Sequence, residues 1–309
     1  MTLPKSPAPF KPLRGVRVLS LALNLPGPAA MMRLQALGAH CSKVEPPTGD
    51  PMDLYSRVAY DMLHQGVKVT RADLRSEAGQ KTVHKLLSRT DVLLTSFRPS
   101  ALRKLGMDWA TLRKGFPALS QVDIVGAAGA RAEEPGHDLT YMAEHGLVQG
   151  LDLPTSLFAD MGGSLMAVEA VMGAVLQQRG KGRGVHLQVA LGGAAAYLGL
   201  PHQWLMTTSG GAVGGGHAGY RVYACKDGRV AVAALEPHFA KSLCHVAGIE
   251  NVDRHTMMAA ETHEAIARFL CAQTRRKLDV LAVERDIPMF TLTDGGERVR
   301  SSCGPLDVP

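Results

Sequence analysis

Residues 15–45 read GVRVLSLALNLPGPAAMMRLQALGAHCSKVE, and their pattern indicates the fold class. An apolar run at residues 16–23, bounded by turn residues, predicts a buried parallel strand. Helical spacing over residues 29–37 ends at Gly38, a natural helix stop, and residues 40–44 predict a second strand. A strand, a helix and a strand in this order predict parallel pairing with a right-handed crossover.

The same alternation continues along the chain. Further strands are expected at residues 67–74, 91–95, 120–125 and 185–189. Helices are expected at residues 76–88, 101–105, 109–114, 138–147, 162–179 and 192–206. Strands and helices alternating at this spacing predict an α/β fold with a Rossmann-like open parallel sheet.

The alternation of strands and helices ends at the glycine-rich stretch SGGAVGGGHAG, residues 209–219, which is the best candidate for a domain boundary. Beyond it, an Asp-Gly turn at Asp227 joins two short strands into a hairpin, and helices are expected at residues 237–246 and 262–274. The sequence therefore predicts a large domain over residues 1–205, a smaller α+β domain over residues 206–290, and a C-terminal tail over residues 291–309.

Composition limits the classes of partner. The net charge is +6, but the basic residues are dispersed and have no interleaved aromatic residues for stacking on bases, so nucleic acid is not expected. A phosphate-rich small-molecule ligand explains the excess of positive charge better. The five cysteines form no CxxC motif, which indicates reduced thiols in a cytoplasmic protein without a metal site. No apolar stretch is expected to approach the length needed to cross a membrane.

Two short motifs carry candidate chemistry. Asp160, in FADMGG, is predicted to lie at or just before a helix N-terminus, where free N–H groups favour a carboxylate or a developing enolate. His137 lies in the motif GHD. A plain helix cap is a common alternative for Asp160, and His137 taken alone is at least as readily an ordinary surface or core histidine. Neither residue alone supports a function.

The motifs taken in order resemble a known family. Besides the opening stretch, they are ADLRSEAGQ, TDVLLTSFRPSALRKLGM, GHDLTYMAEHGL, FADMGGS, GKGRGVHLQVAL and YRVYACKDGRVAVAALEPHF. Each is weak alone, but their order over residues 15–292 is similar to that of the family III CoA-transferase superfamily. That superfamily includes formyl-CoA and carnitine CoA-transferases and alpha-methylacyl-CoA racemases.

The resemblance implies a role for several residues. Asp160 matches the aspartate that is acylated in the transferases and acts as an acid and base in the racemases. His137 matches the racemase histidine on the other face of the substrate, and Glu236 matches a racemase glutamate near that pair. The positions implied for holding the CoA nucleotide are Lys104, Arg98, Phe97, Ala72 and Lys43. Coenzyme A is expected as part of an acyl-CoA substrate, with no permanently bound cofactor, and the protein is expected to be a homodimer.

Three hypotheses stay open at this point. The first is a racemase that epimerises a 2-methylacyl-CoA through His137 and Asp160. The second is a CoA-transferase with Asp160 as nucleophile, which the glycine-rich loop favours because transferases use such a loop to shield their intermediate. The third is a non-catalytic CoA-binding homologue. It is suggested by Pro46, which stands where some members have an arginine, and by a chain shorter than is typical of the family.

Overall fold

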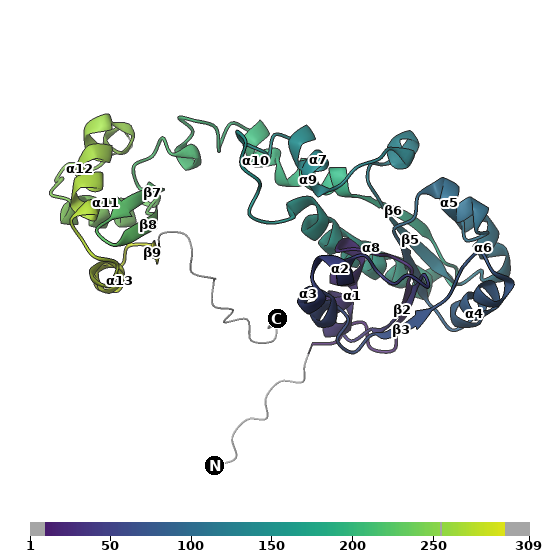
Figure 1. Ribbon diagram of the computed structural model, residues 1–309. Helices are drawn as coiled ribbons and strands as arrows, with labels where there is room; N and C mark the ends of the chain where they lie inside the picture. Colours follow the sequence, from purple (N-terminus) through teal and green to yellow (C-terminus); the bar gives the residue numbers. More distant parts are fainter. Residues whose placement is uncertain (1–9, 254, 294–309) are drawn as a thin grey trace, which may run out of the picture. The chain divides into compact units, whose positions relative to one another are not determined.

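The structure is a computed structural model that describes residues 10–253 and 255–293 (Figure 1). The described residues divide after Gly199 into two compact units. The boundary falls within the apolar segment for which one helix was expected. That segment forms two helices instead, α9 (Leu191–Leu198) and α10 (Leu200–Gln203).

The first unit is built on a six-stranded sheet in the order β3-β2-β1-β4-β5-β6. Its strands are β1 (Arg17–Ser20), β2 (His40–Glu45), β3 (Lys68–Arg71), β4 (Val92–Thr95), β5 (Ser120–Val125) and β6 (His186–Ala190). Every neighbouring pair is parallel. The predicted α/β class with an open parallel sheet is therefore confirmed.

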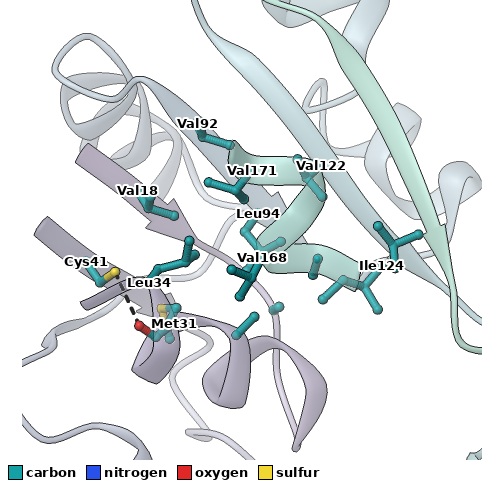
Figure 2. Close-up of a cluster of buried hydrophobic side chains, with 14 of the residues drawn as sticks. Val18, Met31, Leu34, Cys41, Val92, Leu94, Val122, Ile124, Val168 and Val171 are labelled. Atoms are coloured by element: carbon teal, nitrogen blue, oxygen red, sulfur yellow. Dashed lines mark hydrogen bonds between the residues drawn. The ribbon is translucent and has the colours of Figure 1, made fainter. Parts of the chain in front are cut away.

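Helices cover both faces of this sheet. The helices of this unit that precede α9 are α1 (Pro26–Ala36), α2 (Met52–Tyr55), α3 (Arg57–Leu63), α4 (Glu77–Leu87), α5 (Pro99–Lys104), α6 (Trp109–Gly115), α7 (Asp138–Glu144) and α8 (Phe158–Lys181). Neighbouring strand residues point to opposite faces, so Val18 packs with α1 and α8 (Figure 2), whereas Leu19 packs with α4, α5 and α6. The buried side chains on the two faces of the sheet form two hydrophobic clusters, and these clusters hold the strand ends in place.

Close packing at the end of β1 explains one glycine of the opening stretch. A Cβ atom on Gly27 would lie 2.2 Å from the Cβ of Ala22, well inside van der Waals contact. The PGP motif therefore lets α1 start directly against the strand. It begins at Pro26, three residues before the predicted start, because proline is well suited to the first turn of a helix.

Helix α8 differs from the expectation in two ways. It begins at Phe158 rather than at residue 162, so Asp160 lies inside its first turn. It is also the one described helix long and apolar enough to cross a membrane by length and composition, with a mean hydropathy of 1.3, which contradicts the expectation that no stretch reaches that length. In the structure, 44% of that window is buried, and Ala167, Val171 and Val175 pack on the sheet as in a core helix.

The second unit has an antiparallel sheet in the order β7-β8-β9, formed by Tyr220–Cys225, Gly228–Ala233 and Met289–Leu292. The predicted hairpin is confirmed by the pairing of β7 with β8. Its core is closed by three helices: α11 (Pro237–Val246), α12 (Ala260–Cys271) and α13 (Arg275–Glu284). Strand β9 pairs with β8 across the expected start of the tail at residue 291, and residues 294–309 of that tail lie outside the described residues.

Candidate active site

A cavity of about 160 Å³ opens in the first unit where β1, β4 and β5 end. The order of the strands reverses between β1 and β4, and open α/β sheets bind their ligands at such a point, beyond the carboxyl ends of the strands. The residues that line this cavity include Asn24, Phe97, Arg98, Gly126, His137, Tyr141 and Asp160. The structure thus brings His137 and Asp160, which are 23 residues apart in sequence, to one cavity.

Asp160 is the acidic residue of the first turn of α8. Its backbone N–H donates to Oδ1 of the buried Asp138 at 2.9 Å, so Asp138 fixes the start of the helix. Burial raises the pKa of Asp160 to about 6, and the negative charge of Asp138 adds to this. A carboxyl group with a pKa close to neutral can both take and return a proton.

His137 caps the N-terminus of α7. Its backbone N–H donates to Thr140 Oγ1 at 3.1 Å, and that hydroxyl donates back to the carbonyl of His137 at 2.8 Å. This reciprocal pair fixes the backbone of the histidine at the cavity, while the residue itself is exposed. The imidazole is therefore accessible to a substrate.

Two further residues of the GHDLTY motif belong to this site but were not predicted. One is Asp138, and the other is the buried Tyr141, whose ring packs so close to two glycines that a Cβ atom on Gly126 or Gly136 would lie 2.2 or 2.6 Å from its nearest atom. Burial and the charge of Asp160 both raise the pKa of Tyr141. The available signal was that Tyr141 lies in the first turn of the expected helix, four residues after His137.

A second cavity of about 290 Å³ lies beyond the ends of β2 and β3. Two of the expected nucleotide residues, Ala72 and Phe97, line it, and Phe97 also lines the first cavity. Arg98 caps α5 and faces the first cavity, whereas Lys104 is exposed at the last turn of α5. Four of the five predicted nucleotide residues therefore lie at these two cavities or on the helix that follows them.

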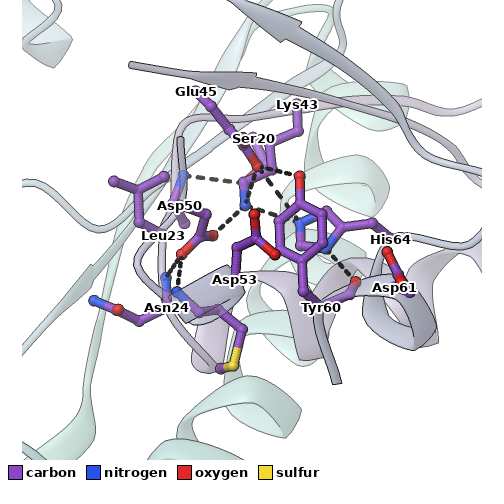
Figure 3. A network of polar contacts seen from close by, with 12 residues as sticks. Ser20, Leu23, Asn24, Lys43, Glu45, Asp50, Asp53, Tyr60, Asp61 and His64 are labelled. Carbon is purple, nitrogen blue, oxygen red and sulfur yellow. Dashed lines mark hydrogen bonds and ion pairs between the residues drawn. The ribbon is translucent and has the colours of Figure 1, made fainter. Parts of the chain in front are cut away.

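Lys43 lies elsewhere, in a buried polar network (Figure 3). Its side chain has no exposed surface, and its ammonium group contacts Asp50, Glu45 at 3.1 Å and His64 at 2.8 Å. Glu45, Asp50 and His64 have the atom types and spacing of a metal site, but the lysine ammonium contacts all three groups and supplies a positive charge there. In this structure Lys43 holds the loop after β2, and direct contact with CoA stays a prediction.

We expect Lys43→Met to lower the free energy of unfolding by about 3–5 kcal/mol, because it leaves two buried carboxylates without their cation. Lys68→Met, at an exposed lysine on the neighbouring strand, should change it by less than about 0.5 kcal/mol. Urea unfolding of both variants measures the difference. Equal stability of the two would show that the network contributes little.

Glu236 lies in the second unit, where it is exposed and caps the N-terminus of α11. Its predicted place beside His137 and Asp160 stays a prediction. The glycine-rich loop also lies in this unit, and His263 Nε2 is 2.9 Å from the carbonyl oxygen of Gly216.

Comparison with known proteins identifies the family. The sequence pattern of CoA-transferase family III matches residues 13–301, and the chain belongs to this family. It is 29% identical to the alpha-methylacyl-CoA racemase of Mus musculus over 80% of this chain and 68% of that protein. It is also 29% identical to the cinnamoyl-CoA:phenyllactate CoA-transferase of Clostridium sporogenes over 59% of this chain, an alignment that spans half of that protein.

A solved structure agrees with the fold. The crystal structure of Rv3272 from Mycobacterium tuberculosis superposes with a TM-score of 0.78 and 26% identity, covering 91% of this chain and 83% of that one. The family expected from the ordered motifs is thus confirmed. Its members are enzymes that use CoA thioesters, and this chain's relatives include both racemases and transferases.

Proposed function

We propose that this protein epimerises a 2-methylacyl-CoA by removing and returning the α-proton. The observation that supports this most is the shared cavity of His137 and Asp160, together with the pKa of about 6 at Asp160. A carboxyl group that exchanges a proton near neutral pH, at the same cavity as an accessible imidazole, suits a reaction that runs in both directions.

The proposed chemistry needs one base and one acid in each direction. The base takes the α-proton, and the C–H electron pair moves into the thioester to give an enolate. The acid then returns a proton to the opposite face of the α-carbon, which inverts it. His137 and Asp160 exchange these roles between the two directions. Glu236 matches the racemase glutamate, and we propose it as a third catalytic residue.

We also propose how coenzyme A is held. The smaller cavity has space for about five water molecules, enough for the reacting end of the thioester only. The second cavity, walled by Ala72, Phe97, Leu74 and Leu105, suits the adenine, and Arg98 and Lys104 suit the phosphates. Because Phe97 borders both cavities, the pantetheine arm would pass along it.

Lys104→Glu should weaken CoA binding at least about tenfold at low salt, because it reverses a charge near the phosphates. Lys114→Glu, an exposed lysine in the last turn of α6, is the matched control and should bind CoA like the wild type. Calorimetric titration with CoA measures both. Equal affinities for the two variants would remove Lys104 from the site.

We propose that the active form is a homodimer, as the family resemblance implies. Several apolar side chains at the start of α8 and on α9 are exposed in the described chain, namely Phe158, Met161, Leu165, Tyr197 and Leu198. Such a patch favours association. Mass measurement at micromolar concentration should give a dimer, and a fully active monomer would contradict the proposal.

We place the protein in the cytoplasm on the evidence of its thiols. Cys41, Cys225, Cys244 and Cys271 are all free in the described residues. Burial raises the pKa of Cys41 to about 12, which makes that thiol unreactive. Free cysteines of this kind suit a reducing compartment.

A CoA-transferase is the second candidate function. In that reaction the Asp160 carboxylate attacks the thioester carbonyl, forms a mixed anhydride and releases CoA as a thiolate. A second carboxylate then displaces the first acid from the anhydride. The CoA thiolate attacks the carbonyl of the new acyl group, which gives the new thioester and frees the Asp160 carboxylate. The glycine-rich loop supports this candidate, and the transferase relative of Clostridium sporogenes does so too.

α-Deuterium incorporation into a 2-methylacyl-CoA in heavy water distinguishes the candidates. Incorporation with loss of optical purity supports the racemase. CoA transfer between two acids without incorporation supports the transferase, and binding without either reaction supports a non-catalytic homologue.

A further inference from the structure

Asn24 occupies an unusual position at the edge of the proposed catalytic cavity. It lies between β1 and α1 and lines the cavity with His137 and Asp160. Its φ angle is 61°, one of three positive values among the described residues other than glycine. Asparagine is one of the few residues with a side chain that tolerates this conformation readily.

A buried carboxylate holds the backbone of Asn24 in this conformation. Asp50 Oδ1 accepts the N–H of Asn24 at 2.9 Å (Figure 3). It also accepts the N–H of Met52 at the same distance. Asp50 is in turn paired with the buried ammonium of Lys43. The charged pair of Lys43 and Asp50 therefore fixes the backbone of one residue that lines the cavity.

The side-chain amide of Asn24 has no partner among the residues described. Its Oδ1 is buried without a hydrogen bond, and none of the described hydrogen bonds uses its amide nitrogen. A buried acceptor left in this state is unfavourable, so the group gains stability when a donor arrives. Within the described part of the chain no bond holds the amide, so it can turn about Cβ–Cγ and bring Oδ1 to the cavity that Asn24 lines.

We infer that Asn24 accepts a hydrogen bond from the pantetheine amide N–H nearest the sulfur of the acyl-CoA. This inference rests on the proposed function. Only a two-carbon link and the sulfur separate that nitrogen from the thioester carbon, so both fit beside each other at the cavity. The bond fixes the thioester between His137 and Asp160, which makes Asn24 a positioning residue.

The test uses S-propyl-CoA, a stable thioether, and its analogue in which the amide nearest the sulfur is replaced by an ester. The analogue has an ester oxygen, which cannot donate, in place of the N–H group. Wild-type protein should bind the amide form at least about tenfold more tightly, because the ester leaves Oδ1 unpaired. Calorimetric titration gives both dissociation constants.

Two variants separate the hydrogen bond from the backbone. Asn24→Gly keeps the positive φ angle without strain and removes the amide, so it should lose the preference and bind both probes within about threefold. Asn24→Asp keeps an acceptor and tolerates the same φ angle, so it should retain the preference for the amide probe. A purely structural role would change the affinity for both probes equally.

The outcomes separate the inference from the proposed function. An unchanged preference in Asn24→Gly, or an equal loss of affinity for both probes, would overturn the inference and leave the proposed function standing. Failure of the wild-type protein to bind S-propyl-CoA at all would overturn the proposed function, and the inference with it.

Discussion

Asp160→Asn should lower turnover by at least about 10²–10⁴-fold on every active substrate, because the amide can neither accept the α-proton nor form an anhydride. The loss is expected whether the enzyme is a racemase or a transferase. Initial rates with a 2-methylacyl-CoA, followed by chiral separation of the products, measure it. Near-normal turnover in this variant would exclude Asp160 from the chemistry.

A stability measurement on the same variant shows that the loss is not caused by unfolding. The folded pKa of Asp160, about 6, is raised above its ordinary value of 3.8, so ionisation of this group opposes folding. That penalty is absent below about pH 4, grows up to about pH 6 and is complete above it. Asparagine does not ionise, so the variant should be at least as stable as the wild type at pH 7.

His137→Ala should block epimerisation by a similar factor, about 10²–10⁴-fold, because inversion needs a second group on the opposite face. Exchange of the α-proton should survive through Asp160 alone. Its rate should fall as the pH drops through about 6, because only the ionised carboxylate takes a proton. His145→Ala, at the histidine just after α7, is a matched control that should epimerise like the wild type.

A transferase gives a different result for the same variant. His137→Ala should then only slow transfer, because the nucleophile is still present. If the variant keeps near-wild-type turnover on every active substrate, the racemase proposal fails. The histidine variant therefore separates two functions that the aspartate variant does not.

Much of the sheet could be predicted because its signals are local. Residues 16–23 carry an apolar run between turns, and Gly38 marks a helix end, so β1, α1 and β2 were expected within a few residues. The start of α8 at Phe158 was not predicted. The hydrogen bond that fixes the first turn is accepted by Asp138, which lies 22 residues before Asp160. A contact between residues so far apart in the chain cannot be inferred from the local sequence pattern.

Candidate site residues could be predicted where short motifs contain them, but not where their role depends on burial in the folded chain. His137 and Asp160 were found from short motifs whose order matched a family. Lys43 was assigned to CoA because the family resemblance places it at a nucleotide-binding position, and its burial does not show in the sequence. Its burial depends on partners from a strand end, a loop and a helix, which only the folded chain brings together. Asn24 was not singled out, since neither its φ angle nor its unpaired amide shows in the sequence.

In the proposed reaction, His137 and Asp160 act on opposite faces of one α-carbon. The most direct test is deuterium exchange by the two variants with each pure enantiomer of a 2-methylacyl-CoA in heavy water. Asp160→Asn should exchange the α-proton of one enantiomer only, and His137→Ala that of the other only, each without inversion. If both variants exchange the same enantiomer, or if neither variant nor the wild type exchanges any, the two-base account is contradicted.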